Sequence, residues 1–361
     1  MSEVAKRATD DRRSLQRVRG WFSPRRIGAI YVWIVLIALF TYLSPDEFPQ
    51  YATVKQILNE YTVTIIVALG LLMPLSAGLY DLSVGAVMGM SGIGTAWFLA
   101  HVSSSPWLAL AVGVGIGLTC GLLNILVVIV MRVDSFIGTL ATSSIIGAVV
   151  IAVSGSNTIT KNVSGAFQED FGLKNVVGLT APVGVMLAGL LALAFTMERT
   201  AFGRRMYATG YDMEVARLGG VKVGGLRALT LVVSASFAAL AGVLQTASLG
   251  AGDPTVGPSF LLPAFAAAFL GATQFRDGRF NPWGCVVAGL LLGTADVGLL
   301  LAGAPQWGPS VFEGALLILA VSLTRANIRN PFGQLRQTIA RLRGRQSGDA
   351  GRTDRASLQG G

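Results

Sequence analysis

The sequence predicts an all-α polytopic membrane protein with about ten transmembrane helices and with both termini in the cytoplasm. Three observations predict this fold. Of the 361 residues, 52% are hydrophobic and only 13% are charged, and the mean hydropathy is +0.61. About ten apolar stretches have the length that a hydrocarbon layer about 30 Å thick requires. Basic residues gather in every second connection between these stretches, as the positive-inside rule describes.

The apolar stretches divide the chain into a membrane domain, residues 27–324, and two basic tails. A window of about 19 residues places the spans at 27–43, 61–79, 82–100, 106–131, 135–153, 182–197, 228–249, 259–272, 282–302 and 309–324. Residues 1–26 are polar and basic, and no cleavage site follows the first span, so we expect an uncleaved anchor behind a cytoplasmic tail. Residues 325–361 form a second basic cytoplasmic tail, and their composition from Gly344 onward predicts partial disorder.

The positions of the basic residues set the predicted orientation. With the N-terminus inside, only three of the 28 Lys and Arg residues face outward, namely Lys55, Lys161 and Lys174. The formal net charge of +9 therefore follows from topology, and we expect no nucleic-acid partner.

A carboxylate interrupts the apolar sequence between the second and third spans. The segment Asp81-Leu82-Ser83-Val84-Gly85 lies within residues 63–100, which are otherwise uncharged. An ionisable residue at such a place indicates a functional role first, because a charge is costly to bury in lipid. The alternative is a cytoplasmic turn in which Asp81 caps the next helix and contacts no cargo.

The second half of the chain repeats this motif. Asp253-Pro254-Thr255-Val256-Gly257 follows the seventh span, and both segments read Asp-x-Ser/Thr-Val-Gly. Because five spans separate them, the two copies are predicted to run in opposite directions. That arrangement is typical of an inverted repeat, here of the second to fifth and the seventh to tenth spans, whose broken helices flank a central path.

The larger of the two substantial cytoplasmic connections, residues 198–227, contains a signal for a short helix. Asp212 is a suitable N-cap, Glu214 suits the positive end of the first turn, and Gly219-Gly220 ends the helix. Its apolar side consists of Val215, Ala216 and Leu218. Because isolated helices shorter than about 12–15 residues are marginal, this one needs a partner surface. That surface is either another protein or the membrane-facing underside of this chain.

The sequence contains no constellation of residues typical of an enzyme. It has no Gly-x-x-x-x-Gly-Lys-Ser/Thr loop, no His-Glu-x-x-His or Cys-x-x-Cys pair and no Gly-x-Ser-x-Gly elbow. We therefore expect no catalytic residue, no metal ligand and no cofactor bound by this chain.

Neutral polar groups outnumber carboxylates in the predicted spans. The carboxylates at or near membrane depth are Asp81, Asp296 and Glu313. The neutral groups are Ser76, Ser91, Asn124, Thr139, Thr142, Ser143 and Ser144. Hydroxyls and amides suit a neutral polyhydroxylated cargo better than an ion, although such groups also join helices to one another in lipid.

Several segments, taken in order, resemble one known family. Residues 78–85, Gly-Leu-Tyr-Asp-Leu-Ser-Val-Gly, are similar to the Gly-Ile-Asp-Leu-Ser-Val-Gly signature of ribose-type (branched-chain/simple-sugar) permeases of bacterial ABC importers. Asn124 and residues 136–140 continue the resemblance, and residues 199–204, 216–221, 240–242, 252–254 and 270–273 complete it, so that it spans about residues 54–323. Asp134-Ser135 departs from the family's usual proline pair, and Leu262-Pro263 stands where relatives often carry an acidic residue.

The resemblance implies a transmembrane permease subunit that imports a sugar or sugar-like solute across the bacterial inner membrane. The implied partners are a second permease copy, two ABC ATPase domains that bind the ATP, a periplasmic or lipid-anchored substrate-binding protein, and membrane lipid. The family's coupling helix to the ATPase falls on Asp212, Glu214, Ala216, Arg217, Leu218, Gly219 and Gly220. We place Asp81, Ser83, Gly85, Asn124, Phe136, Thr139, Asp253 and Asp296 in the translocation path.

Two other functions stay open at the level of the sequence. A proton-coupled secondary carrier would use Asp81, Asp296 and Glu313 to move protons. A scaffolding membrane protein would use its polar groups for helix packing alone.

Overall fold

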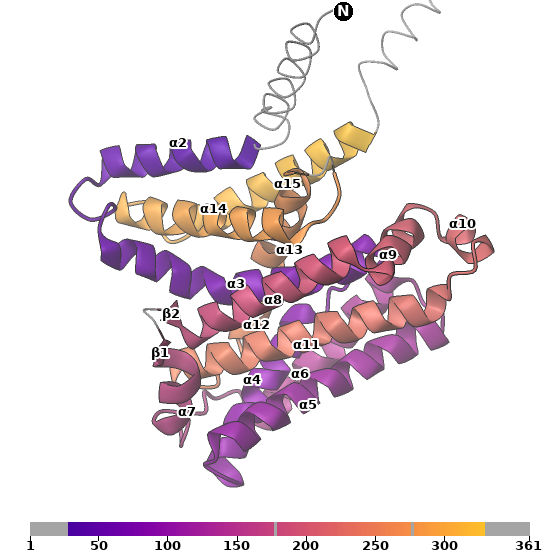
Figure 1. Cartoon of the computed structure of the whole chain (residues 1–361). Coiled ribbons are helices and arrows are strands. Elements are labelled where there is room, and N and C mark those ends of the chain that lie inside the picture. Colours follow the sequence, from indigo (N-terminus) through magenta and orange to yellow (C-terminus); the bar gives the residue numbers. More distant parts are fainter. Residues whose placement is uncertain (1–27, 177–178, 276–277, 329–361) are drawn as a thin grey trace, which may run out of the picture.

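The computed structural model describes residues 28–176, 179–275 and 278–328, whose regular secondary structure is helical apart from one antiparallel hairpin of two two-residue strands (Figure 1). In chain order the elements are α2 (Gly28–Leu43), α3 (Tyr51–Ser76), α4 (Val84–His101), α5 (Pro106–Ile125), the π-helical η1 (Leu126–Val130), α6 (Ser135–Ser154), α7 (Ala166–Gln168), the π-helical η2 (Glu169–Leu173), β1 (Asn175–Val176), β2 (Leu179–Thr180), α8 (Ala181–Arg199), α9 (Ala201–Tyr211), α10 (Met213–Leu218), α11 (Val223–Leu249), α12 (Val256–Ser259), α13 (Leu261–Ala272), α14 (Pro282–Leu301) and α15 (Gly308–Ile328).

The prediction of an all-α polytopic membrane protein is confirmed. Within the described ranges, 6 helical segments are long and apolar enough to cross a membrane by length and composition: α3, α5 with η1, α6, α8, α11 and α14. Shorter apolar helices cover Gly28–Leu43, Val256–Ala272 and Gly308–Ser322. A helix coincides with each of the predicted apolar stretches, while the count of ten crossings stays a prediction.

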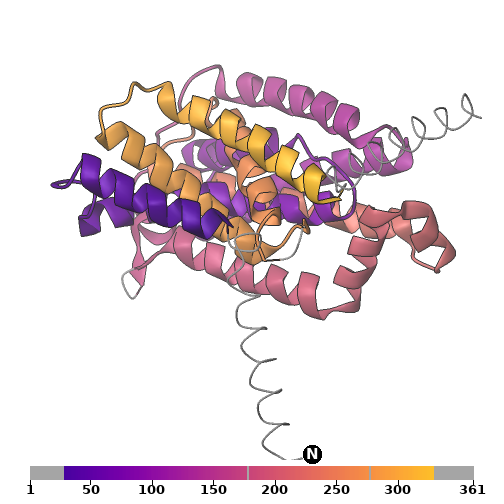
Figure 2. The same ribbon diagram turned by 90° about the horizontal axis from the view of Figure 1, so that it is seen from above.

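Helix α3 forms the centre of the bundle. Every residue from Tyr61 to Ala77 is buried, which is the pattern of a helix enclosed by protein on all sides. Figure 1 shows α2, α13, α14 and α15 on one side of α3 and α4, α5, α6 and α11 on the other, and Figure 2 gives the view from above. The helix begins at Tyr51, ten residues before the predicted span. The prediction placed the start too late because Lys55 and Glu60 lower the hydropathy of this segment, although they do not interrupt the helix.

The two Asp-x-Ser/Thr-Val-Gly motifs form the same local turn. In the first motif, Asp81 Oδ1 accepts hydrogen bonds from the backbone N–H (3.1 Å) and the hydroxyl (2.6 Å) of Ser83. In the second, Asp253 Oδ1 accepts the corresponding bonds from Thr255, at 2.8 and 2.7 Å. The sequence similarity of the two segments therefore extends to their hydrogen bonds.

The glycines that end the two motifs pack backbone to backbone. A Cβ atom placed on Gly85 would lie 2.9 Å from the carbonyl oxygen of Gly257. A Cβ atom on Gly257 would overlap the carbonyl oxygen of Gly85 and lie 2.8 Å from Cα of Gly89. Only glycine permits this approach, so the start of α4 and α12 are in direct contact at the middle of the molecule.

The contact between Gly85 and Gly257 predicts how one added methyl group at Gly257 affects stability. Gly257→Ala should lower the midpoint of thermal unfolding in detergent, because overpacking against a backbone costs about 1–3 kcal/mol. Gly147→Ala on α6 is the matched control, since nothing lies within 4 Å of a Cβ atom there. Equal midpoints for the two variants would contradict the packing described.

Candidate functional site

Asp81 lies in a polar network in the interior, between α3 and α4. Its side chain is 1% exposed. Oδ1 accepts the two bonds from Ser83, and Oδ2 accepts a bond of 2.7 Å from the hydroxyl of Ser234 on α11. Asp81 is therefore more than a local helix cap, because it joins the segment between two helices to a third helix.

The network continues from Ser83 to two further helices. The hydroxyl of Ser83 accepts a bond of 2.6 Å from Nδ2 of Asn124 on α5. Oδ1 of Asn124 in turn accepts a bond of 2.6 Å from the hydroxyl of Thr142 on α6. All of these side chains are buried, so a continuous chain of hydrogen bonds connects α11, the 77–83 segment, α5 and α6.

Hydroxyl groups of α6 also bind the backbone of the 77–83 segment. The N–H of Leu82 donates to Oγ1 of Thr139 at 3.0 Å, and the N–H of Tyr80 donates to Oγ of Ser135 at 3.2 Å. Irregular backbone at membrane depth is tolerated only where protein or water satisfies its polar groups. Thr139 and Ser135 meet that requirement here.

The structure brings together four of the residues placed in the translocation path: Asp81, Ser83, Asn124 and Thr139. Gly85 follows them at the contact with Gly257, and Asp253 belongs to the second motif. Phe136 lies at the edge, half exposed, with its ring centroid 6.3 Å from that of Tyr80. Sequence reasoning missed Ser234, because a single serine in an apolar span carries no signal of its own.

Asp296 lies in a different cluster from Asp81. Its side chain, on α14, lies close to that of Glu313 on α15, and its Oδ1 has no hydrogen-bond partner among the described residues. Oε1 of Glu313 also accepts a bond of 3.3 Å from the hydroxyl of Tyr61 on α3. This second cluster joins α3, α14 and α15, and it takes no part in the Asp81 network.

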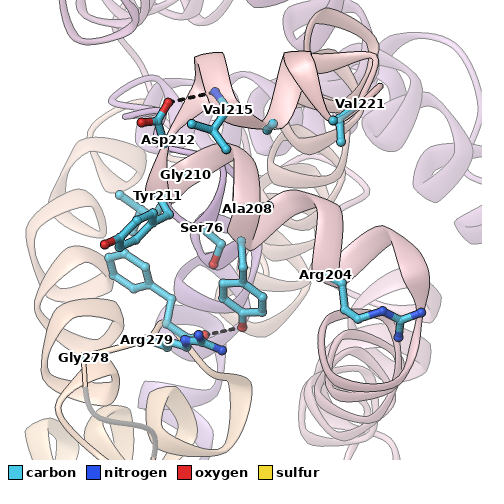
Figure 3. A pocket seen from close by; sticks show the side chains of 15 residues that line it. Ser76, Arg204, Ala208, Gly210, Tyr211, Asp212, Val215, Val221, Gly278 and Arg279 are labelled. Atoms are coloured by element: carbon cyan, nitrogen blue, oxygen red, sulfur yellow. Dashed lines mark hydrogen bonds between the residues drawn. The ribbon is translucent and has the colours of Figure 1, made fainter.

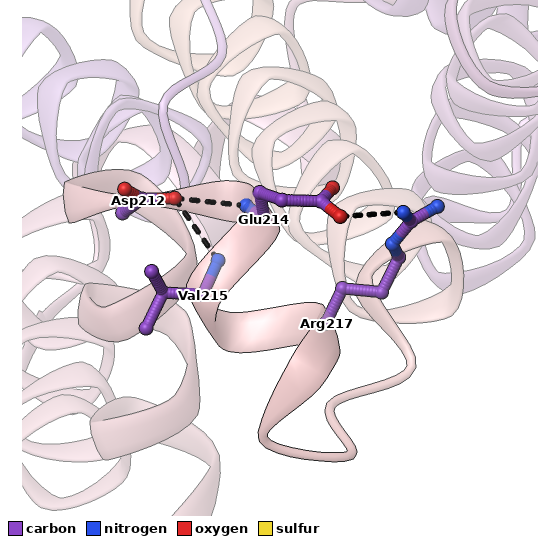
Figure 4. A network of polar contacts seen from close by, with 4 residues as sticks. All are labelled: Asp212, Glu214, Val215 and Arg217. Carbon is purple, nitrogen blue, oxygen red and sulfur yellow. Dashed lines mark hydrogen bonds and ion pairs between the residues drawn. The ribbon is translucent and has the colours of Figure 1, made fainter.

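The short helix expected after Asp212 is α10. Asp212 Oδ1 accepts bonds of 3.0 Å from the backbone N–H groups of both Glu214 and Val215, and Glu214 pairs with Arg217 at 2.6 Å (Figure 4). Ala216 is buried, whereas Val215 and Leu218 are 63% and 79% exposed. Two of the three residues on the apolar side of α10, Val215 and Leu218, are thus not covered by the described part of this chain.

A cavity of about 820 Å³ opens beside α10 (Figure 3). The end of α3, the helices α9 and α10, and residues 278–280 enclose it. The hydroxyl of Tyr207 on α9 donates to the carbonyl oxygen of Phe280 at 2.6 Å, and the guanidinium of Arg279 lies 5.7 Å from the centre of the Tyr207 ring. The cavity therefore has a mostly apolar lining with two basic residues, Arg204 and Arg279, next to the exposed apolar side chain of Val215.

Comparison with known proteins assigns the chain to a family. The family described as "Branched-chain amino acid transport system / permease component" matches residues 53–321. The chain belongs to this permease family. Together with the sugar permeases described next, this match confirms the resemblance to ribose-type permeases and the prediction of a transport permease component.

The proteins to which this chain is similar include three sugar permeases. The D-allose transport system permease protein of Escherichia coli is 32% identical over 305 residues, which cover 83% of this chain and 91% of the relative. The fructose import permease protein of Rhizobium meliloti is 31% identical over 333 residues, covering 89% and 91%. The ribose import permease protein of Bacillus subtilis is 29% identical over 301 residues, covering 83% and 93%.

Both sites lie within the part of the permease that the family covers. The Asp81 network and the α10 helix fall between residues 53 and 321. The permease thus combines a buried network of mostly neutral groups with a helix whose apolar side chains are exposed, and the two features belong to separate regions of the chain.

The network predicts different effects for two substitutions of Asp81. Asp81→Ala should destabilise the permease strongly, since each buried group left without a partner costs about 1–3 kcal/mol. Asp81→Asn should be milder, because its amide can donate to the Ser234 hydroxyl, which can accept. Thermal unfolding in detergent measures both, with Ser144→Ala, an exposed hydroxyl bonded to Leu140, as the control. An Asp81→Ala protein as stable as Asp81→Asn would contradict the network.

Proposed function

We propose that the permease is the translocating subunit of a bacterial ABC importer for a sugar or sugar-like solute, powered by separate ATPase subunits. One observation carries this proposal: three relatives that align with 83–89% of the chain are named for allose, ribose and fructose. The family description names branched-chain amino acids, but the neutral hydroxyls and amides around Asp81 favour a neutral polyhydroxylated cargo.

The Asp81 network is the proposed wall of the translocation path. It fixes the irregular 77–83 segment between three helices, and it leaves Tyr80 and Phe136 partly exposed at its edge. A second permease copy facing this edge would complete the path. Asp253 would occupy the corresponding place in an inverted repeat, a proposal that the matching turns and the Gly85–Gly257 contact support.

The ATPase is the proposed partner of α10. The sequence contains no Gly-x-x-x-x-Gly-Lys-Ser/Thr loop, so in the proposed importer another subunit binds the ATP. The exposed side chains of Val215 and Leu218 offer an apolar surface for that subunit. Burial of such side chains in a protein groove is favourable by about 25 cal/mol per Å² of apolar surface.

The proposed orientation has α9, α10 and both chain ends on the cytoplasmic side of an inner membrane. In support, Figure 1 shows the Gly28 end of α2 and the Ile328 end of α15 directed toward the end of the bundle that carries α9 and α10. The hairpin β1–β2 and α7 lie at the opposite end, where a periplasmic or lipid-anchored binding protein would deliver the cargo. Ten crossings satisfy this arrangement.

Reconstitution tests the proposed function. The permease, its ATPase subunits and the binding protein are placed in proteoliposomes, and uptake of the sugar that the binding protein carries is followed across pH. We expect uptake to require ATP and all of the subunits. Uptake that needs no ATPase and responds to a proton gradient would overturn the proposal in favour of a secondary carrier.

Two substitutions in α10 test the ATPase contact. Glu214→Arg and Leu218→Asp should abolish both uptake and sugar-stimulated ATP hydrolysis while membrane insertion is retained. Glu214→Arg places a like charge in the interface, and Leu218→Asp places a desolvated polar group there. Each change costs about 2–5 kcal/mol of binding free energy. Glu214→Gln and Leu218→Met are the matched controls and should remain active. Unaltered uptake in both test variants would reject the assignment.

Cysteine labelling tests the orientation in a background without Cys120 and Cys285. A cysteine at Ser164, an exposed position before α7, should react with an impermeant thiol reagent from outside the cell. A cysteine at Ala208, exposed on α9, should react only after the membrane is permeabilised. Reversed labelling would contradict the cytoplasmic position of α10.

A further inference from the structure

Helix α9 packs against the end of α3 through backbone atoms. A Cβ atom on Gly210, the second-last residue of α9, would overlap the carbonyl oxygen of Ser76 and lie 3.0 Å from its carbonyl carbon and 3.2 Å from the nitrogen of Gly78. Gly78 has φ +74°, and a Cβ atom there would lie 3.4 Å from Cα of Gly210. No side chain separates the two segments, so neither can move toward the other without displacing it.

On one side this contact is rigidly continuous with α10. Asp212 ends α9, where its N–H donates to the carbonyl oxygen of Ala208 at 3.1 Å. The same residue begins α10 through the two bonds from its carboxylate to Glu214 and Val215. Because one residue caps both helices, a displacement of α10 by a bound partner is passed to α9 with no flexible linker between them.

On the other side the contact leads to the Asp81 network. Gly78 is separated from Asp81 by two residues, of which Leu79 is fully buried with its N–H bonded to the carbonyl oxygen of Pro74 at 2.9 Å. Asp81 is held in turn by Ser234 and Ser83. A displacement of the backbone at Ser76–Gly78 therefore moves the 77–83 segment, which contains Asp81 and Ser83.

The junction also has an unsatisfied group and free space beside it. Oγ of Ser76 is buried and has no hydrogen-bond partner among the described residues. The same serine lines the 820 Å³ cavity between α9, α10 and residues 278–280 (Figure 3). The cavity beside this serine leaves room for a movement of α9.

We propose that Gly210 is the positioning residue through which the ATPase acts on the translocation path. Movement of α10 shifts α9, and the backbone contact of Gly210 with Ser76 and Gly78 passes the shift to the Asp81 network. This inference rests on the proposed function and adds to it the place of mechanical transmission. Allosteric coupling of this kind requires two sites and an element that both of them bias, which here is the end of α3.

The test uses the complete importer, with permease, ATPase subunits and binding protein in proteoliposomes. Gly210→Ala should lower the number of sugar molecules imported per ATP hydrolysed by about tenfold, within the range typical of coupling between sites. ATPase subunits should still co-purify with the variant, because α10 is unchanged. Gly225→Ala on α11, where nothing lies within 4 Å of a Cβ atom, is the control and should keep the wild-type ratio.

A second variant keeps the test decisive if Gly210→Ala fails to accumulate. One glycine inserted between Tyr211 and Asp212 leaves the backbone contact and both caps of α10 intact but loosens its link to α9. We expect the same loss of sugar imported per ATP. A wild-type ratio in either variant, or loss of the ATPase subunits from Gly210→Ala, would overturn the proposal. Absence of ATP-dependent uptake in the wild-type importer would instead contradict the proposed function.

Discussion

The need to satisfy backbone polar groups away from water governs the centre of this permease. Between Ala77 and Ser83 the chain leaves helical geometry, and its N–H groups would be unpaired in an apolar surrounding. The hydroxyls of Ser135 and Thr139 and the carboxylate of Asp81 accept these donors. With α6 bonded to this segment, two further hydrogen bonds connect the segment to other helices. Ser234 on α11 donates to Asp81, and Asn124 on α5 donates to Ser83.

The sequence predicted the features that a local pattern determines. The lengths of the apolar stretches located the helices, and the Asp81 motif marked the irregular segment between α3 and α4. Asp212 and Gly219 marked the two ends of α10. It could not predict Ser234 as the partner of Asp81, because that pairing joins residues 153 positions apart. It also missed the early start of α3, since hydropathy does not report helical geometry in a polar segment.

The separation of the carboxylates bears on the mechanism. A secondary carrier that used Asp81, Asp296 and Glu313 together would need them along one proton path. Instead, Asp81 is bonded to hydroxyls on α11 and in its own turn, while Asp296 and Glu313 lie together between α14 and α15. The structure therefore agrees with the sugar-permease relatives. Glu313, which lies beside Asp296, accepts a hydrogen bond from Tyr61 and so connects α15 to α3.

Backbone contacts between glycines occur at several places in this permease, among them Gly92 with Gly242 and Gly271 with Gly284, and two further contacts flank the Asp81 segment. Gly85 and Gly257 join the two motifs in the interior, and Gly78 and Gly210 join the end of α3 to the helix before α10. Side chains between helices can change rotamer and absorb a displacement, but two backbones in contact cannot. The proposed transmission from α10 to the Asp81 network requires that stiffness, which the close approach of the two backbones provides.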